Sequence, residues 1–234
     1  MSATTLEKRE IVKKSGYVYI CIACVLLVLF ATLSVLLTCV DVQEAGKSQA
    51  PVGFSTLNQA VFDAIGEHEI ALTVSVLGGL TIIGTIGAFG VLGIVQAVRR
   101  KGILRADKEL YVMAGGLVLL AVAYVFFELV IINYRPVLED GALAASFPSS
   151  HSMLAVAVAG MGTAYLLGRI KSVAWRVVSA LVLSAAAIVT VAGRLLGGVH
   201  WLTDIAGGCL YGLFVVFAYL AVCAFVQRKD RESA

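Results

Sequence analysis

Three short stretches of this chain contain the side chains that phosphate chemistry needs. They stand at the ends of long apolar runs and read Arg135-Pro136, Pro148-Ser149-Ser150-His151, and Arg194 followed by His200 and Asp204. Arginine binds phosphoryl oxygens through two parallel hydrogen bonds, and two histidines can supply a nucleophile and a proton donor. Ionisable groups at membrane depth are costly and therefore mark functional sites. These residues predict a phosphate site that works without a metal ion.

The apolar runs that separate these stretches predict a helical membrane protein. Of the 234 residues, 60% are hydrophobic and 14% are charged, whereas a soluble domain averages about 25% charged residues. A helix needs about 20 apolar residues to cross the hydrocarbon layer. We predict an all-α fold, a single domain over residues 1–234 that forms a six-span transmembrane bundle. The predicted spans cover about residues 17–40, 70–98, 110–133, 152–167, 177–199 and 202–226.

The loop between the first two predicted spans is the longest connection. Its apolar residues Phe54, Leu57, Val61 and Ile65 recur at helical spacing. This pattern predicts a short helix that lies in the outer interface of the membrane. An irregular loop is the alternative.

The distribution of lysine and arginine predicts the orientation of the spans. Fifteen of the 18 basic residues fall in the two tails, in the second-to-third connection and in the fourth-to-fifth connection. Cytoplasmic loops are enriched in such residues. We therefore predict a multi-pass protein of the plasma (inner) membrane with both termini cytoplasmic and the three chemical stretches on the extracytoplasmic face. The basic clusters are topology signals, and nothing in the chain indicates nucleic-acid binding.

The local spacing around the histidines predicts how they are oriented. Ser149 is a natural N-cap for the fourth span, and a helix N-terminus attracts anions. Ser150 adds a second hydroxyl donor there. His200 and Asp204 are four residues apart, so Asp204 can accept from one ring nitrogen of His200 and leave the other nitrogen basic.

Glu128 and Tyr134 are the candidate site-lining residues. Glu128 lies within an apolar run, seven residues before Arg135, so two helical turns would put both on one face. We predict that Glu128 pairs with Arg135 or Arg194 and orients the arginines. Two alternatives remain open: a protonated Glu128 that donates to a phosphoryl oxygen, and an ionised Glu128 that binds a cationic part of the substrate. Tyr134 adjoins Arg135.

No cofactor or metal ion is expected. A metal site made of His151, His200 and Asp204 is disfavoured, because the two nearby arginines would repel the cation. The five cysteines lie in apolar runs or at their ends, which is typical of small apolar filler rather than of a disulfide framework or a zinc site.

Together the three stretches resemble the motifs of the type 2 phosphatidic acid phosphatase family, within the vanadium haloperoxidase-like superfamily. That family reads Lys, six residues, Arg-Pro; then Pro-Ser-Gly-His; then Ser-Arg, five residues, His, three residues, Asp. The resemblance covers about residues 128–204 and the six-span plan. The chain departs from the pattern at three positions, where Glu128 replaces Lys, Ser150 replaces Gly and Gly193 replaces Ser.

The resemblance implies a role for each motif residue. His200 resembles the nucleophile that forms a phosphohistidine, Asp204 its orienting partner, and His151 the general acid and base. The phosphate ligands implied by the resemblance and by the helix N-terminus are Arg135, Arg194, Ser149 and Ser150.

The resemblance implies a metal-independent phosphatase that acts on a lipid phosphate or diphosphate at the extracytoplasmic face. Membrane members of the family act on phosphatidate, phosphatidylglycerophosphate or polyprenyl diphosphates such as undecaprenyl diphosphate, and so belong to phospholipid metabolism in the broad sense. The alternatives are a phosphoryl or lipid-headgroup transferase of the same fold, and a non-catalytic lipid-phosphate binder or transporter. The expected partners are the lipid substrate and membrane lipids, with no obligatory protein partner.

Overall fold

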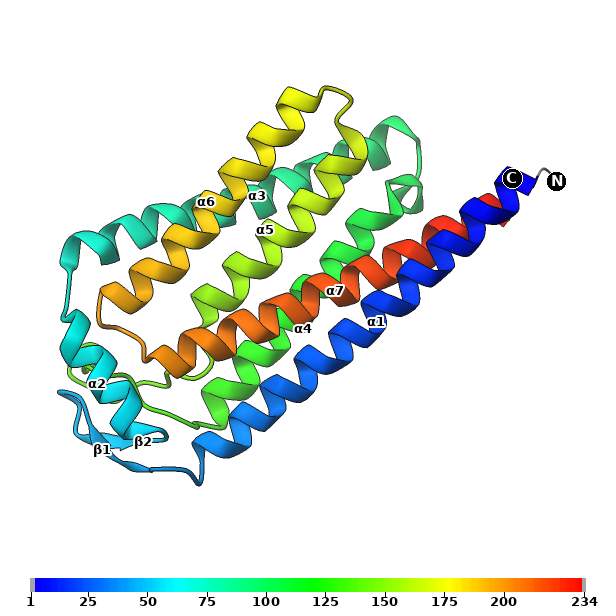
Figure 1. The fold of residues 1–234 in the computed structure, drawn as a ribbon. Helices are drawn as coiled ribbons and strands as arrows, with labels where there is room; N and C mark the ends of the chain where they lie inside the picture. Colours follow the sequence, from blue (N-terminus) through cyan, green and yellow to red (C-terminus); the bar gives the residue numbers. More distant parts are fainter. Residues whose placement is uncertain (1–2, 233–234) are drawn as a thin grey trace.

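The computed structural model describes residues 3–232, and the side chains of residues 14–226. Six of the helices described are long and apolar enough to cross a membrane, so the predicted six-span helical bundle is confirmed (Figure 1). The elements are α1 (Ala3–Leu37), β1 (Gln43–Ala45), β2 (Ala50–Val52), α2 (Ser55–Ile65), α3 (Glu69–Arg99), η1 (Ile103–Arg105), α4 (Lys108–Leu129), α5 (Ser150–Arg169), α6 (Val173–Leu196) and α7 (Leu202–Glu232).

The first loop contains the predicted short helix, α2, and a small hairpin that the sequence did not predict. Strands β1 and β2 pair antiparallel, with Gln43 opposite Val52. The carboxylate of Asp41 accepts a hydrogen bond from the backbone N–H of Thr56 at 2.8 Å and so satisfies one of the free donors at the start of α2. The first loop is therefore built from regular elements, a hairpin and a helix, and the alternative of an irregular loop is wrong.

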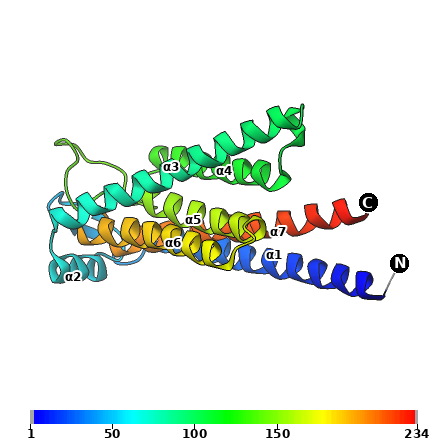
Figure 2. The ribbon, with the colours of Figure 1, turned by 90° about the horizontal axis from the view of Figure 1, so that it is seen from above.

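Helices α5 and α7 are the central spans, because each packs against four others. Helix α7 contacts α1, α4, α5 and α6, and helix α5 contacts α3, α4, α6 and α7. Helices α1 and α7 lie side by side and antiparallel (Figure 1). Seen from above, α3 and α4 form one layer over a second layer of α1, α7, α5 and α6 (Figure 2).

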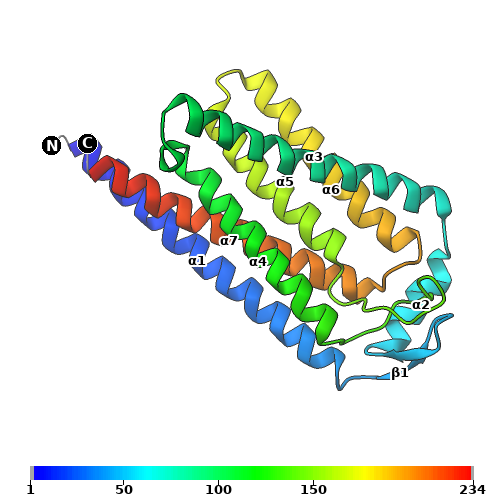
Figure 3. The same cartoon turned by 180° about the vertical axis from the view of Figure 1, so that it is seen from behind.

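The connections between consecutive spans lie alternately at one end of the bundle and at the other (Figure 3). We call the end where α1 begins and α7 ends the tail end; the α3–α4 and α5–α6 connections also lie there. The opposite end, the site end, contains α2, the hairpin, residues 130–149 and the α6–α7 turn. All three chemical stretches meet at the site end. The basic residues of the two connections lie at the tail end. Of the basic residues in the tails, Lys14 is exposed, and the others have side chains outside the described ones: Lys8, Arg9, Lys13, Arg228, Lys229 and Arg231.

The third span is shorter than predicted, which corrects the relation between Glu128 and Arg135. Helix α4 ends at Leu129, so the prediction that these two residues share a helix face is wrong. Pro136 disfavours a helical conformation at the preceding residue. The chain instead forms an extended pair, in which Ser146 N–H donates to Asn133 O at 2.9 Å and Arg135 N–H to Ala144 O at 3.1 Å.

The start of α5 and the start of α7 are held close together. A Cβ atom at Gly208 would lie 2.6 Å from the carbonyl oxygen of Ser149, and one at Gly212 would lie 2.8 Å from that of Met153. Small residues allow such close approach of membrane helices. The backbone N–H of Ser149 also donates to the carbonyl of Asp204 at 3.0 Å. This contact places the Pro148–His151 stretch directly beside His200 and Asp204.

Candidate active site

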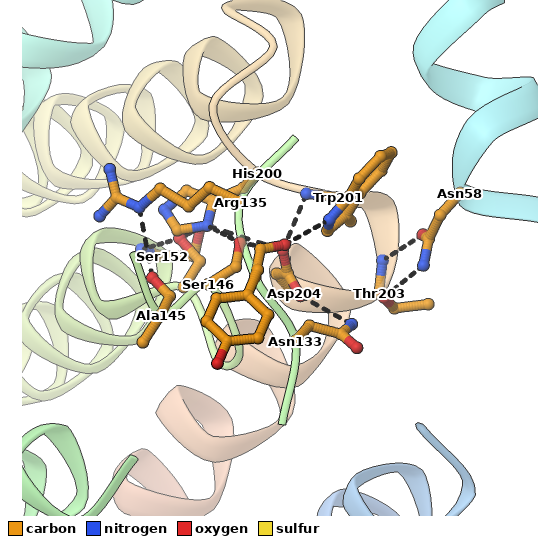
Figure 4. Close-up of polar contacts among 12 residues, drawn as sticks. Asn58, Asn133, Arg135, Ala145, Ser146, Ser152, His200, Trp201, Thr203 and Asp204 are labelled. Carbon is orange, nitrogen blue, oxygen red and sulfur yellow. Dashed lines mark hydrogen bonds and ion pairs between the residues drawn. The ribbon is translucent and has the colours of Figure 1, made fainter. Parts of the chain in front are cut away.

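Four segments deliver polar side chains to one place at the site end (Figure 4). Figure 4 labels residues of three of them: residues 133–146, the first turn of α5 and the α6–α7 turn. The fourth is the last turn of α6, from which the charge of Arg194 acts on His151. The α6–α7 turn is possible because Gly198 adopts a positive φ of 67°, which glycine tolerates without strain. Residues more than 60 positions apart in the sequence thus form a single cluster.

His200 and Asp204 are buried together but do not touch directly. The His200 Nδ1 to Asp204 Oδ2 distance is 3.8 Å, which is too long for a hydrogen bond. The hydroxyl of Ser146 stands between them, 3.1 Å from Nδ1 and 2.5 Å from Oδ2. The direct hydrogen bond expected from their spacing is therefore replaced by a relay through Ser146.

The Asp204 carboxylate is held by further donors. The backbone N–H of Trp201 donates to Oδ2 at 2.8 Å, and the side-chain amide of Asn133 donates to Oδ1 at 3.4 Å. The Trp201 indole donates to the Tyr134 carbonyl at 2.7 Å, which ties the α6–α7 turn to the loop. Phe62 of α2 packs on the Trp201 ring at 5.7 Å. The outer-loop helix thus supports the site from the outside.

Three buried nitrogen atoms in this cluster have no hydrogen-bond partner among the described residues. They are Nδ1 of His151, Nε of Arg194 and Nε2 of His200. The charges of Arg194, His200 and Arg135 all act on His151, so these residues are electrostatic neighbours. Leaving a buried donor or acceptor unpaired costs about 1–3 kcal/mol. An anion with several oxygens would accept from Nε of Arg194 and from a protonated His151, and the lone pair on Nε2 of His200 would be free to attack its central atom.

The environment of His200 favours its neutral form. Burial lowers the pKa of the imidazole below its ordinary value of 6.5, and the charges of Arg135 and Arg194 act in the same direction. The charge of Asp204 opposes this shift without reversing it. A neutral imidazole has a lone pair and can act as a nucleophile.

Arg135 is paired with a residue that the sequence did not single out. Its Nη1 lies 2.9 Å from Oε1 of Glu139, whose side chain is 51% exposed. Its Nε donates to the Ala145 carbonyl at 3.3 Å. A carboxylate presents the same kind of oxygen acceptors as a phosphoryl group, so Glu139 occupies Arg135 in the way that a phosphate could.

A small cavity reaches His200 from the side of α4. Its polar lining residues are Glu128, Arg135, Ser146, Ser150 and His200, and its other lining residues are Tyr124, Phe127, Ala145, Phe147, Pro148 and Met153. Tyr134 is not among them and contributes its carbonyl to Trp201 instead.

The predicted pairing of Glu128 with an arginine is wrong. Among the described side chains Glu128 forms no ion pair, and Arg135 pairs with Glu139 instead. Glu128 is exposed and lies on the rim of the cavity. The two other interpretations of this residue remain open.

Ser149 is the N-cap of α5, as predicted. Its hydroxyl oxygen accepts from Ser152 N–H at 3.4 Å and from the Ser152 hydroxyl at 3.1 Å. A serine hydroxyl also has one hydrogen to donate, and these two contacts do not use it.

Gly193 differs from the family motif for a packing reason. A Cβ atom at this position would lie 2.5 Å from the carbonyl oxygen of Ala71 and 2.6 Å from the Cβ of Ser75. The backbones of α3 and α6 are therefore too close for the serine that the family has. Ser75 of α3 bonds to the backbone of α6 here, donating to the Thr190 carbonyl at 3.0 Å.

Comparisons with known proteins agree with the motifs. Residues 126–228 match the family model of the PAP2 superfamily. The fold is similar to the crystal structure of the first transmembrane PAP2 type phosphatidylglycerolphosphate phosphatase from Bacillus subtilis, with a TM-score of 0.57 and 20% sequence identity. The similarity covers 84% of this chain and 93% of that one. A comparison with curated proteins found no significant match. The match to the PAP2 superfamily thus covers the part of the chain that contains the three motifs, and the six-span fold is similar to that of a PAP2-type phosphatase.

Proposed function

We propose that this protein is a membrane lipid phosphatase that hydrolyses a lipid phosphate or diphosphate through a phosphohistidine. The observation that carries the proposal is the set of three unpartnered buried nitrogens on His151, Arg194 and His200. Together they offer a nucleophile, a proton carrier and a cation that act on one another electrostatically. The family match and the similar phosphatase fold support the same general activity.

The first half of the reaction forms the covalent intermediate. The lone pair on Nε2 of His200 attacks phosphorus, and the bond from phosphorus to the leaving oxygen breaks. His151, protonated at this stage, gives its proton to that oxygen. Arg194 and Arg135 stabilise the negative charge on the equatorial oxygens of the five-coordinate state, and Arg135 exchanges Glu139 for the phosphoryl group.

The second half regenerates the enzyme. The now neutral His151 takes a proton from a water molecule, which attacks the phosphohistidine. The bond between phosphorus and Nε2 breaks, inorganic phosphate leaves, and His151 is again protonated. Two arginines supply the charge stabilisation that a metal ion would otherwise provide, so we propose that the reaction is metal-independent.

A transferase of the same fold is the second candidate, because a lipid hydroxyl could replace water in the second step. The rim of the cavity, with exposed Glu128 and Tyr124, favours a lipid as the first substrate in both cases. The remaining alternative is a non-catalytic lipid-phosphate binder, which would use the same phosphate ligands but would form no phosphohistidine.

Phosphate release from the purified protein tests the proposal. The panel contains phosphatidate, phosphatidylglycerophosphate, undecaprenyl diphosphate and a soluble phosphate monoester, each with and without EDTA. We expect release of inorganic phosphate from at least one lipid and no loss in EDTA. A labelled histidine without phosphate release, and with label transfer to an added lipid alcohol, would favour the transferase. No label and no release on any lipid would favour the non-catalytic binder.

We further propose that the site end faces the extracytoplasmic side and both termini face the cytoplasm. The support is the concentration of basic residues in the tail-end connections. In a variant without the native cysteines, a cysteine at exposed Ala142 should react with an impermeant thiol reagent in intact cells, and one at exposed Lys101 should react only after lysis. The reverse pattern would overturn the orientation.

A further inference from the structure

Ser146 lies where it can control the protonation of the proposed nucleophile. Its hydroxyl contacts both His200 and Asp204, at 3.1 and 2.5 Å, in a place where those two residues are 3.8 Å apart. The exposed fractions of Ser146, His200 and Asp204 are 2%, 3% and 0%. Bulk water therefore does not compete for these contacts.

Counting hydrogens fixes the direction of each bond. Asp204 receives hydrogens from Trp201 N–H, from the Asn133 amide and from Ser146, as an acceptor carboxylate does. A serine hydroxyl has one hydrogen, so the Ser146 oxygen, having donated to Asp204, can only accept from His200. Nδ1 of His200 must then be protonated, and in the neutral ring Nε2 has the lone pair.

The backbone around Ser146 is fixed by its neighbours. Ser146 N–H donates to the carbonyl of Asn133 at 2.9 Å, and the Asn133 side chain accepts from Gly53 N–H at 3.0 Å. The ring of the next residue, Phe147, is stacked on Phe30 of α1 at 5.8 Å. The hydroxyl is thus held in place from the hairpin, the loop and the first span.

We propose that Ser146 is a positioning residue that selects the tautomer of His200 and transmits the charge of Asp204 to its ring. This inference rests on the proposed function, because it takes His200 as the nucleophile. Without the hydroxyl, a gap separates the imidazole from Asp204, and the ring is free to place its proton on Nε2. That tautomer cannot attack phosphorus.

Kinetics of three variants test the role. Ser146→Ala should lower kcat about 10- to 100-fold with little change in KM, as expected for removal of the partner that orients a histidine. Ser146→Thr, which retains a hydroxyl, should restore most of the lost rate. The matched control is Ser75→Ala, which removes another fully buried serine hydroxyl that bonds only to helix backbone; its kcat should stay within about threefold of the unmodified protein. Equal kcat for Ser146→Ala and the control would overturn the proposal.

A second measurement does not depend on the Ser146 variants or on turnover. The chain contains three histidines, so nuclear magnetic resonance of isotope-labelled histidine can be assigned by replacing His68 and His151 in turn. We expect His200 to show protonated Nδ1 and unprotonated Nε2 near neutral pH. A proton on Nε2 in the unmodified protein would refute the proposal even if the enzyme is active. If no lipid phosphate is hydrolysed, the proposed function fails, yet this spectrum still decides the role of Ser146.

Discussion

The two ends of the bundle each bury a polar cluster, and the clusters differ in how completely their atoms are paired. At the tail end, Asp107 is the centre. Its carboxylate accepts from Gln96 at 3.0 Å and from the Tyr165 hydroxyl at 2.8 Å. It also lies 3.0 Å from Arg100 and 3.2 Å from Arg169. We call these five residues the tail-end cluster.

The site end also contains a buried, paired carboxylate, Asp204, but other side chains around it are not fully paired. His151, Arg194 and His200 each keep a buried nitrogen without a partner among the described residues. The difference teaches how to separate structural from functional polar groups in this fold. A cluster that satisfies itself stabilises the bundle, while one that leaves groups unpaired is arranged for a ligand.

The largest effect is expected from the nucleophile. His200→Ala should abolish turnover and the transient phosphoryl label, because no other described group offers an unpaired nitrogen that is held by a carboxylate relay. Mass spectrometry after a rapid quench should find acid-labile, base-stable phosphate on His200 in the unmodified protein. Label on a serine during turnover would contradict the assignment.

A smaller but still large effect on activity is expected when Arg194 is removed. Arg194→Ala should lower kcat/KM by about 100- to 1,000-fold, since it removes a charge that acts on the transition state. It should not lower the thermal midpoint in detergent, because Nε of Arg194 has no partner to lose. A loss of stability equal to the loss of activity would show that the site-end cluster is also structural.

The tail-end cluster should give the opposite result. Asp107→Asn should lower the free energy of unfolding by about 2 kcal/mol, because it weakens hydrogen bonds to a charged group. The specific activity of the folded fraction should be unchanged, since the residue lies at the far end of the bundle. Thermal unfolding and phosphate release on the same sample measure both quantities.

The pH dependence of that stability has a definite sign. Burial alone would raise the pKa of Asp107, but the hydrogen bonds from Tyr165, Gln96 and Arg100 and the charge of Arg169 outweigh burial and lower it. Asp107 therefore binds a proton more readily in the unfolded chain than in the folded protein. The stabilisation is present above pH 3.8 and is lost as the pH falls below that value through the lowered folded pKa. The difference between the unmodified protein and Asp107→Asn should shrink over that range.

The smallest effect is expected at Glu128, which borders the cavity without pairing to either arginine. Glu128→Gln should change kcat by only a few-fold on simple lipid phosphates. Glu128→Lys, which restores the family motif, should remain active on them. Loss of activity confined to amine-bearing substrates would favour the cation-binding interpretation, and a Glu128→Gln enzyme as inactive as His200→Ala would favour the proton-donating one.

The spans and the short outer helix could be predicted from the sequence, because hydropathy and helical spacing are local properties. The ends of α4 and the course of residues 130–149 could not. They depend on pairing of residues 133–135 with residues 144–146 and on Asn133 reaching Gly53, contacts between segments far apart in the chain. Ser146 and Glu139 were missed for this reason, since neither occupies a motif position and each gains its partners only in the folded loop.

Gly193 shows a second limit of prediction from the sequence alone. The motif position alone indicates a missing hydroxyl, but the reason lies on α3, whose Ala71 carbonyl occupies the space a Cβ would need.

The position of the cavity rim on α4 has a kinetic consequence. Tyr124 and Glu128 lie on a span, exposed at its surface, while α2 packs over Trp201 at the site end. A substrate that enters past α4 arrives from within the plane of the bilayer. Its encounter rate is then set by its mole fraction among the surrounding lipids, not by its concentration in the bulk solution. In mixed micelles the velocity should fall when inert detergent is added at constant total substrate, as in surface dilution.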